Sequence, residues 1–393
     1  MNTIVTLLLA LAAMFFLSEI LRIVKVPRVV SHIIAGMIFG IPFLKDVLFT
    51  QESAWLIGFL ADIGAILLLF FVGIQIDLRQ ITKEIVPSWW ISFFNTILPL
   101  SLGFVASRYV FGMEYGTSLI VGVCMSVSAT AIALDLMEEF GKLRTRLGAL
   151  IVSAGSFDDI VELFLITSVL TVLETSVMHT SIAQLASGVV LFAILVVAFR
   201  LWAIPFVLYL VEQQPERAQL FTAALIITLF MASLAEILGI GALIGALFSG
   251  VIWRQVLLKD KGHRPWEKAE ITHSMHTLAF GFIVPFFFFH VGFQTNILAI
   301  WQNLTFGIVI TLLSIAGTVV GSATGYVLSY HNWNEAWIAG WAMNAKGDTE
   351  LVIAQFALTA GVISSQVFSS LIFMALISTL ISPFMLRHLL KKK

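Results

Sequence analysis

Three carboxyl groups accumulate in one apolar stretch of the chain, GSFDDIVELFLI at 155–166. Asp158 and Asp159 are adjacent, and Glu162 follows Asp158 by one helical turn. A carboxyl group in a low dielectric favours its neutral, protonated form, and two adjacent carboxylates repel each other when both are ionised. Such a pair can bind a monovalent cation when deprotonated and release it on protonation. This is the chemistry that a proton-coupled cation exchanger requires.

The composition places this pair in a polytopic membrane protein whose main partner is the lipid bilayer. The chain has 393 residues, of which 59% are hydrophobic and 11% charged, and its mean hydropathy is +1.00; soluble domains carry about 25% charged residues. A net charge of −1 gives no support to a nucleic-acid surface. Cys124 is the single cysteine, so an intrachain disulfide is excluded.

The apolar runs predict thirteen transmembrane helices, because a bilayer core about 30 Å thick needs about 20 helical residues per crossing. Most Lys and Arg residues then fall on one side if the N-terminus is outside and the C-terminus cytoplasmic. We expect an integral protein of a prokaryotic plasma membrane, without a soluble regulatory domain in this chain. The predicted spans are 2–21, 29–44, 54–76, 87–111, 116–137, 147–173, 183–211, 217–237, 240–254, 275–297, 303–329, 335–359 and 362–387.

Thirteen spans divide into two inverted six-helix repeats joined by a linker helix at 183–211, an organisation common in transporters. The fifth and twelfth spans then occupy equivalent positions, and both contain polar residues. The fifth carries CMSVSATAIALD at 124–135, whose Ser and Thr residues could line a cavity or serve as small residues in helix packing. A charge at the bilayer centre costs at least ~2.5–3.5 kcal/mol, so we expect an interrupted, functional twelfth span. Its polar residues are Asn344, Lys346, Asp348, Thr349 and Glu350.

The run SVSATAIALDLMEEFGKLRTRLGALIVSAGSFDDIVEL at 126–163 resembles the central signature of the monovalent cation/proton antiporters, in particular the NapA-type and KefC-type branch. DIGAILLLFFVGIQIDL at 62–78, PFFFFHVGFQTN at 285–296 and MNAKGDTELVIA at 343–354 are similar to further family motifs. The resemblance implies an all-α, NapA/NhaA-like antiporter fold in which the two broken helices cross.

The same resemblance implies roles for single residues and for whole segments. Asp159 would be the principal carboxylate for cation and proton, and Asp158 its companion; these two would hold the Na⁺ or K⁺. The site would be lined by Ser128, Thr130, Ser126 and Ser156. In a homodimer, scaffold helices in 1–86 and 212–302 would hold a mobile core formed by 87–182 and 303–393. Transport would follow alternating access.

One position departs from the family pattern. Members with two adjacent aspartates usually have a lysine that pairs with the first aspartate, whereas in SIAGTVVGSATG at 314–325 Thr318 holds that place. Lys346 could substitute as the partner of Asp158. The two ionisable carboxyl groups favour electrogenic exchange, and electroneutral exchange stays open.

The sequence thus predicts proton-coupled exchange of a monovalent cation, with Na⁺ favoured over K⁺ or Li⁺ and with no bound cofactor. The alternatives are a K⁺/H⁺ antiporter of the KefC type, a cation channel and a sodium-coupled solute symporter. An enzyme is not expected, because adjacent aspartates cannot approach a peptide bond from two sides. Asp135 and Glu138 could form a cytoplasmic funnel that concentrates cations, or simply a solvated helix end.

Overall fold

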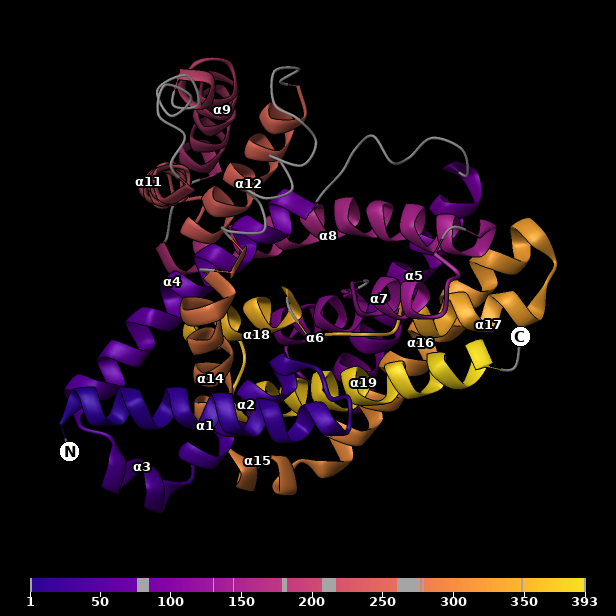
Figure 1. Ribbon diagram of the computed structural model, residues 1–393, viewed down its shortest axis with the longest axis horizontal. Coiled ribbons are helices and arrows are strands. Elements are labelled where there is room, and N and C mark those ends of the chain that lie inside the picture. The colour runs from indigo at the N-terminus through magenta and orange to yellow at the C-terminus, as the bar shows by residue number, and fades with distance from the viewer. Residues whose placement is uncertain are drawn as a thin grey trace. The chain divides into compact units, whose positions relative to one another are not determined.

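The computed structural model describes residues 2–75, 85–129, 131–143, 145–178, 182–206, 217–259, 276–277, 279–347 and 349–391 (Figure 1). All regular secondary structure in these residues is helical, as the sequence predicts. The chain divides into two compact units. The first consists of 1–50, 78–166 and 289–393, and the second of 51–77 and 167–288.

The first unit contains the Asp158–Asp159 pair and both predicted interrupted spans. Two helices continue from one unit into the other: α8 (Arg146–Met178) at its C-terminal part and α14 (Val284–Gln294) at its N-terminal part. The remaining helices of the first unit are α1 (Thr3–Ile23), α2 (Arg28–Phe39), α3 (Pro42–Leu48), α5 (Ile85–Val105), the π-helical turn η1 (Ala106–Val110), α6 (Tyr115–Ser126), α7 (Ala131–Glu139), α15 (Ile297–Gln302), α16 (Leu304–Tyr330), α17 (Trp333–Ala342), α18 (Thr349–Thr359) and α19 (Ser365–Lys391).

The second unit is built around the packing of α4 (Gln51–Gln75) on α12 (Ala242–Lys259). A Cβ at Gly73 would lie 2.2 Å from the Leu247 carbonyl oxygen, and one at Gly250 would lie 2.0 Å from that of Phe70. These glycines therefore allow the two backbones to approach each other closely, which is typical of helix packing in membranes. The other elements of this unit are α9 (Ile182–Ala198), η2 (Phe199–Ala203), α11 (Arg217–Ile237) and η3 (Ala279–Ile283).

Within the described residues, six helices are long and apolar enough to cross a membrane, or seven if α2 and α3 form one bent span. The helices begin and end close to the predicted spans, although the number thirteen and the inverted repeats stay predictions. The span predicted at 29–44 is not straight, since α2 and α3 are bent by 81°. The bend follows Gly40 and Ile41, and Pro42 begins α3, a position where its missing N–H costs no hydrogen bond.

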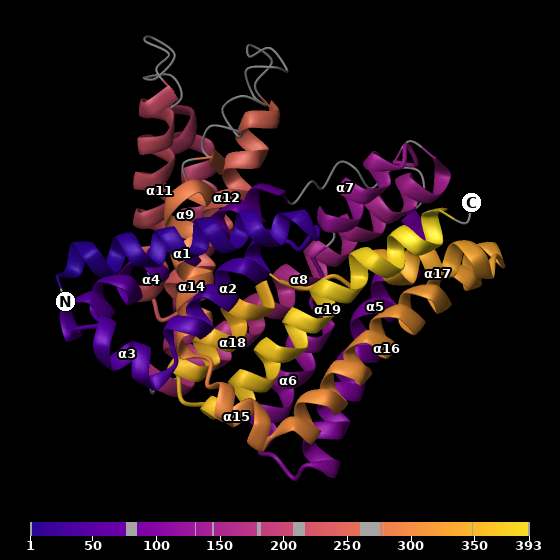
Figure 2. The same ribbon diagram turned by 60° about the horizontal axis from the view of Figure 1, so that its bottom comes forward.

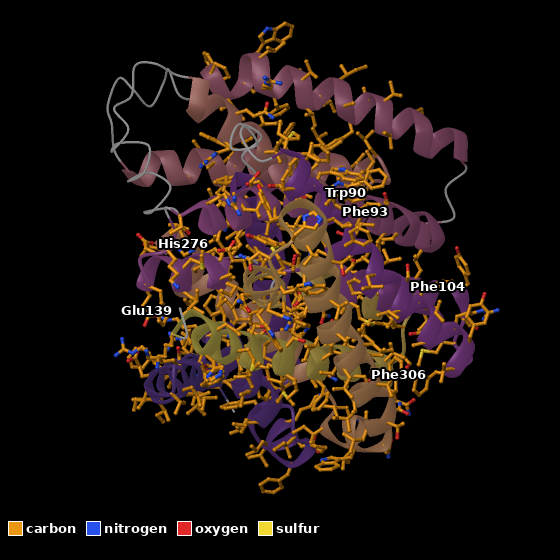
Figure 3. All side chains as sticks on the ribbon, turned by 90° about the vertical axis from the view of Figure 1, so that its right-hand side faces the viewer. Trp90, Phe93, Phe104, Glu139, His276 and Phe306 are labelled. Atoms are coloured by element: carbon orange, nitrogen blue, oxygen red, sulfur yellow. The ribbon has the colours of Figure 1, made fainter. Side chains whose placement is uncertain are left out.

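The helix α5 has two different faces. Its aromatic side chains include the stacked pair Trp89 and Phe93, with ring centroids 5.1 Å apart. Trp89 is 44% exposed and Phe93 is 40% exposed, as expected for side chains that face lipid. Trp90 and Phe93 are labelled on this helix in Figure 3. The other face carries buried polar residues, namely Ser88, Ser92, Asn95 and Thr96. The polar face is therefore turned toward protein.

This buried face is brought close to α16, which lies beside α5 and α19 (Figure 2). Gly317, Gly321 and Gly325 recur every four residues along α16 and face α5. A Cβ at Gly321 would lie 2.3 Å from the Phe94 carbonyl oxygen, and one at Gly325 would lie 2.4 Å from that of Trp90. Because only glycine fits at these distances, the spacing allows short side chains on the two helices to meet.

Candidate ion-exchange site

Both predicted interrupted spans are interrupted in the structure. The helix α6 ends at Ser126 and α7 begins at Ala131, while α17 ends at Ala342 and α18 begins at Thr349. The two breaks meet, since the Ala129 backbone N–H donates to the Ala345 carbonyl oxygen at 2.7 Å. Non-helical backbone at membrane depth is tolerated only where protein or a water-filled cavity supplies such partners. Gly347, with φ of +153°, adopts a conformation that favours glycine.

Lys346 donates hydrogen bonds to carbonyl groups at the first break. Its side chain is fully buried, and its Nζ donates to the carbonyl oxygens of Met125 at 2.8 Å and Val127 at 2.6 Å. The ammonium group thereby lies at the C-terminal end of α6, where a positive charge is favourable to the helix dipole. The Lys346 carbonyl in turn accepts a hydrogen bond from the Thr379 hydroxyl of α19.

Asp158 is held by uncharged donors from two elements. Its side chain is buried, with 3% of its surface exposed. From α5, Asn95 Nδ2 donates to Oδ1 at 3.0 Å, Thr96 Oγ1 at 3.3 Å and Ser92 Oγ at 3.4 Å. From the break between α6 and α7, the Ser128 hydroxyl donates to Oδ2. Such a set of donors stabilises a buried carboxylate without a counter-ion.

Sequence reasoning missed the contribution of α5, and Asn95 above all. Asn95 Nδ2 also lies 3.1 Å from Ser128 Oγ, and its Oδ1 accepts from the Ser322 hydroxyl of α16 at 2.9 Å. The sequence does contain a signal for this face: Ser88, Ser92 and Asn95 follow at spacings of four and three residues, which places them on one side of a helix.

Asp159 differs from its neighbour in both exposure and partners. Its side chain is only partly buried, and within the described part of the chain no hydrogen bond or ion pair to its carboxyl group is found. It lies near the charge of Asp158. Among the described residues, the pair therefore consists of one carboxyl group with four hydrogen-bond donors and one for which no donor is found.

Glu162 connects the helix of the aspartates to the second break. It accepts a hydrogen bond from the hydroxyl of Thr349, the first residue of α18. The carboxyl groups of Glu350, Asp158 and Glu162 interact with the charge of Lys346. Among the described residues, Lys346 and Asp158 do not form an ion pair. The pairing of Lys346 with Asp158 that the sequence suggested is therefore an electrostatic interaction at a distance and not a direct contact.

The other predicted site residues are placed as follows. The hydroxyls of Ser126 and Ser156 bond to carbonyls of their own helices, at Val123 and Val152. Thr318 is fully buried on α16, one turn before Ser322. The Asn344 amide donates to Ser382 at 2.8 Å.

Three further predictions fall partly or wholly outside the described residues. Thr130 and Asp348 are not described at all. Asp135 lies on α7, although its side chain is outside the described part. Glu138 is exposed near the end of α7, which is compatible both with a cytoplasmic funnel for cations and with a solvated helix end.

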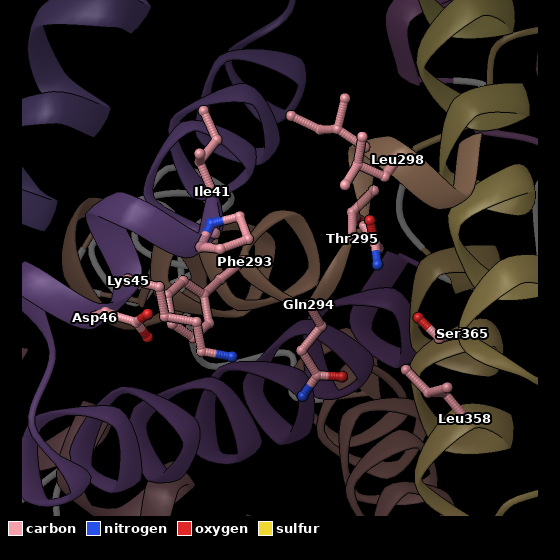
Figure 4. A pocket seen from close by; sticks show the side chains of 13 residues that line it. Ile41, Lys45, Asp46, Phe293, Gln294, Thr295, Leu298, Leu358 and Ser365 are labelled. Atoms are coloured by element: carbon pink, nitrogen blue, oxygen red, sulfur yellow. The ribbon is translucent and has the colours of Figure 1, made fainter. Parts of the chain in front are cut away.

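A cavity of about 830 Å³ lies elsewhere in the first unit. Lys45 and Asp46 line one side, near Phe293, and Leu358 and Ser365 lie on the opposite side (Figure 4). Asp158 and Asp159 do not line it. Among the described residues, no group of three or more His, Cys, Asp and Glu side chains is placed to hold a metal ion.

These observations define a class: an all-helical membrane protein whose interrupted helices meet beside buried carboxyl groups, the architecture of a secondary transporter. The comparison with protein families is specific. Residues 5–392 match the family described as "Sodium/hydrogen exchanger, transmembrane", and the chain belongs to this family.

Curated relatives and a solved structure agree with this assignment. The chain is 25% identical over 387 residues to a Na⁺/H⁺ antiporter of Enterococcus hirae, covering 98% of this chain and 97% of the relative. It is also 25% identical over 362 residues to the Na⁺/H⁺-K⁺ antiporter GerN of Bacillus cereus, covering 92% and 89%. The structure of the sodium proton antiporter MjNhaP1 from Methanocaldococcus jannaschii matches with a TM-score of 0.66 at 15% identity, covering 98% of this chain and 95% of that one. This last likeness establishes the fold.

Proposed function

We propose that this protein exchanges Na⁺ for H⁺ across a membrane, with cation and proton competing at Asp158 and Asp159. The observation that carries the proposal is the contrast between the two carboxyl groups. Asp158 is buried and held by neutral donors, whereas Asp159 beside it is partly exposed and receives no hydrogen bond from the residues that the structure describes. Deprotonated Asp159 is the cation ligand in this proposal, and its protonation releases the cation.

The charges around the pair support a cationic substrate. In the described part of the site, Asp158, Asp159, Glu162 and Glu350 oppose the one ammonium group of Lys346. An excess of acidic groups attracts cations and repels anions. The Enterococcus and Bacillus relatives, a Na⁺/H⁺ antiporter and a Na⁺/H⁺-K⁺ antiporter, support the same substrates.

The mechanism we propose is alternating access in a protein of thirteen spans that are organised as two inverted six-helix repeats. The core segments 87–182 and 303–393, which contain the two breaks and the aspartates, move against the scaffold segments 1–86 and 212–302. The division into core and scaffold is a proposal about which helices move during transport. The two compact units of the structure describe only which residues pack together, and so do not test it.

The working unit in this proposal is a homodimer in a prokaryotic plasma membrane. Light scattering that gives a monomer in detergent and in nanodiscs would contradict the dimer.

A K⁺/H⁺ antiporter is the second candidate, because the relative GerN is named as an antiporter of K⁺ as well as Na⁺. In this proposal the selectivity depends on the size of the coordination shell around Asp159. The experiment below therefore compares the cations directly.

The test is dequenching of a pH-sensitive dye in proteoliposomes with an acidic interior. We expect Na⁺ addition to drive proton efflux, with Li⁺ and K⁺ giving the order of selectivity, and Asp159→Asn to reduce the response to that of empty vesicles. Unchanged activity of Asp159→Asn would contradict the assigned site. Cation flux that does not depend on the pH gradient would indicate a channel, and cation flux that requires an organic solute would indicate a symporter. A K⁺/valinomycin voltage clamp separates electrogenic from electroneutral exchange.

A further inference from the structure

The amide of Asn95 has only one orientation that satisfies its neighbours. A carboxylate oxygen of Asp158 lies 3.0 Å from Nδ2, and only the NH₂ end of an amide can donate to it. The Oδ1 end must then accept, and the Ser322 hydroxyl donates to it at 2.9 Å. The side chain is fully buried, so a reversed amide would leave two acceptors facing each other without water.

The same NH₂ group serves two parts of the site. Besides Asp158 on α8, it lies 3.1 Å from Ser128 Oγ in the break between α6 and α7. Ser128 itself donates to the other carboxylate oxygen of Asp158. Asn95, Asp158 and Ser128 thus form a closed triangle of hydrogen bonds that joins α5, α8 and the break.

The triangle is anchored to α16 by the close packing of that helix on α5. Ser322 follows Gly321, the residue at which the α16 backbone comes nearest to Phe94 of α5. Neither α5 nor α16 contains a charged residue. The chain that runs from Ser322 through Asn95 to Asp158 is therefore uncharged up to the carboxyl group, and an amide keeps its hydrogen bonds whether the site holds a cation or a proton.

We propose that Asn95 is the positioning residue of the exchange site: its amide, oriented by Ser322, holds the Asp158 carboxyl group against Ser128 and so sets the affinity for the transported cation. This inference rests on the proposed function. It assigns a role in transport to α5 and α16, whose residues do not themselves carry the ion.

The experiment measures the Na⁺ concentration dependence of exchange in proteoliposomes. Loss of a hydrogen bond to a charged group corresponds to about tenfold or more in an equilibrium constant. We therefore expect Asn95→Ala to raise the KM for Na⁺ about tenfold or more, with a much smaller effect on the maximal rate. Ser322→Ala removes only the group that orients the amide and should raise the KM by a smaller factor. Ser88→Ala, a buried position two turns earlier on α5, is the matched control and should leave the KM unchanged.

An exchange of the two side chains separates positioning from mere packing. Asn95→Asp alone places two carboxyl groups together and should abolish exchange. The double variant Asn95→Asp/Asp158→Asn restores one carboxyl group and one amide, and the hydroxyls of Ser128 and Ser322 can still find partners because a hydroxyl both donates and accepts. We expect the double variant to recover exchange relative to Asn95→Asp, with folding of each variant checked by size-exclusion chromatography.

Two sets of results would overturn the inference. Wild-type KM values in both Asn95→Ala and Ser322→Ala would do so, and so would a folded double variant that is no more active than Asn95→Asp. Asp159→Asn, assayed in the same vesicles, distinguishes this failure from that of the proposed function. If Asp159→Asn is inactive and the Asn95 variants are normal, only the inference fails; if the wild type itself does not exchange, both fail.

Discussion

Lys346 is a charged residue whose burial is costly. Its side chain is fully buried, and its ammonium group donates hydrogen bonds to two carbonyls at the end of α6. Lys346→Met would remove the ammonium donor from both carbonyls, leaving the Met125 carbonyl only the Ser314 hydroxyl at 3.4 Å, and would remove the charge that favours this helix end. We expect the free energy of unfolding to fall by about 2–4 kcal/mol. Thermal unfolding in detergent measures the change.

Lys45→Met is the matched control for this prediction, since Lys45 is exposed. It should leave the unfolding transition where it is. A Lys346→Met protein as stable as the wild type would contradict the anchoring role of the ammonium group. If Lys346→Gln keeps the normal pH profile of exchange, then Lys346 does not serve as the partner of Asp158.

The sequence indicated the charged residues of the site, and the family resemblance indicated Ser128, but neither indicated the α5 residues that hold Asp158. Asp158, Asp159 and Lys346 are conspicuous because each charge in an apolar span has a large cost. The Asn95 amide has a smaller cost and resembles the many polar residues that only bond neighbouring helices. Its partners depend on the approach of α16 to α5, which is a matter of tertiary packing, and so the role of Asn95 could not be predicted from spacing alone.

At the scale of helices, the glycines of α16 determine how closely that helix approaches α5. Gly321→Ala would place a Cβ 2.3 Å from the Phe94 carbonyl oxygen, so the two backbones would have to separate. We expect a loss of about 1–3 kcal/mol in the free energy of unfolding, together with a raised KM for Na⁺ because Ser322 would move away from Asn95. Unfolding in detergent and the vesicle assay measure the two effects.

Gly307→Ala is the matched control on the same helix. A Cβ at Gly307 would lie 3.4 Å from the nearest atom, the Phe373 side chain, and needs little or no movement of the backbone. Equal losses of stability in the two variants would show that glycine in α16 matters for helix conformation and not for the contact with α5.

The long helices were predicted from apolar length, and the break in the twelfth predicted span from its charged residues in mid-span. For the fifth predicted span the residues alone left cavity lining and helix packing open, and its break was implied by the family resemblance. Shorter elements were missed. The bend between α2 and α3 falls inside the predicted span 29–44, which is apolar from Ile33 onward, although Gly40 and Pro42 give a local signal. The six-residue helix α15 depends on its N-cap, where the Asn296 side chain accepts from the Ala299 N–H at 3.1 Å. Such single-turn elements leave no hydropathy signal.

For the whole molecule, the distribution of basic residues predicts an external N-terminus and a cytoplasmic C-terminus. In a Cys124→Ser background, we expect Lys45→Cys to react with a membrane-impermeant maleimide in intact cells and Thr145→Cys to react only after permeabilisation. Lys45 and Thr145 are both exposed, so access to the reagent depends on the side of the membrane. The reverse pattern would invert the orientation, and equal labelling of both sites in intact cells would refute the assignment of these loops to opposite sides.

The exchange itself is tested most directly by following the cation. Proteoliposomes with an acidic interior and a basic exterior are given a trace of ²²Na⁺ outside, with the voltage clamped. We expect the wild type to accumulate Na⁺ above its external concentration for as long as the pH gradient lasts, and Asp159→Asn to take up no more than empty vesicles. Accumulation by Asp159→Asn equal to that of the wild type, or wild-type uptake that stops at equal concentrations, would contradict proton-coupled exchange at Asp159.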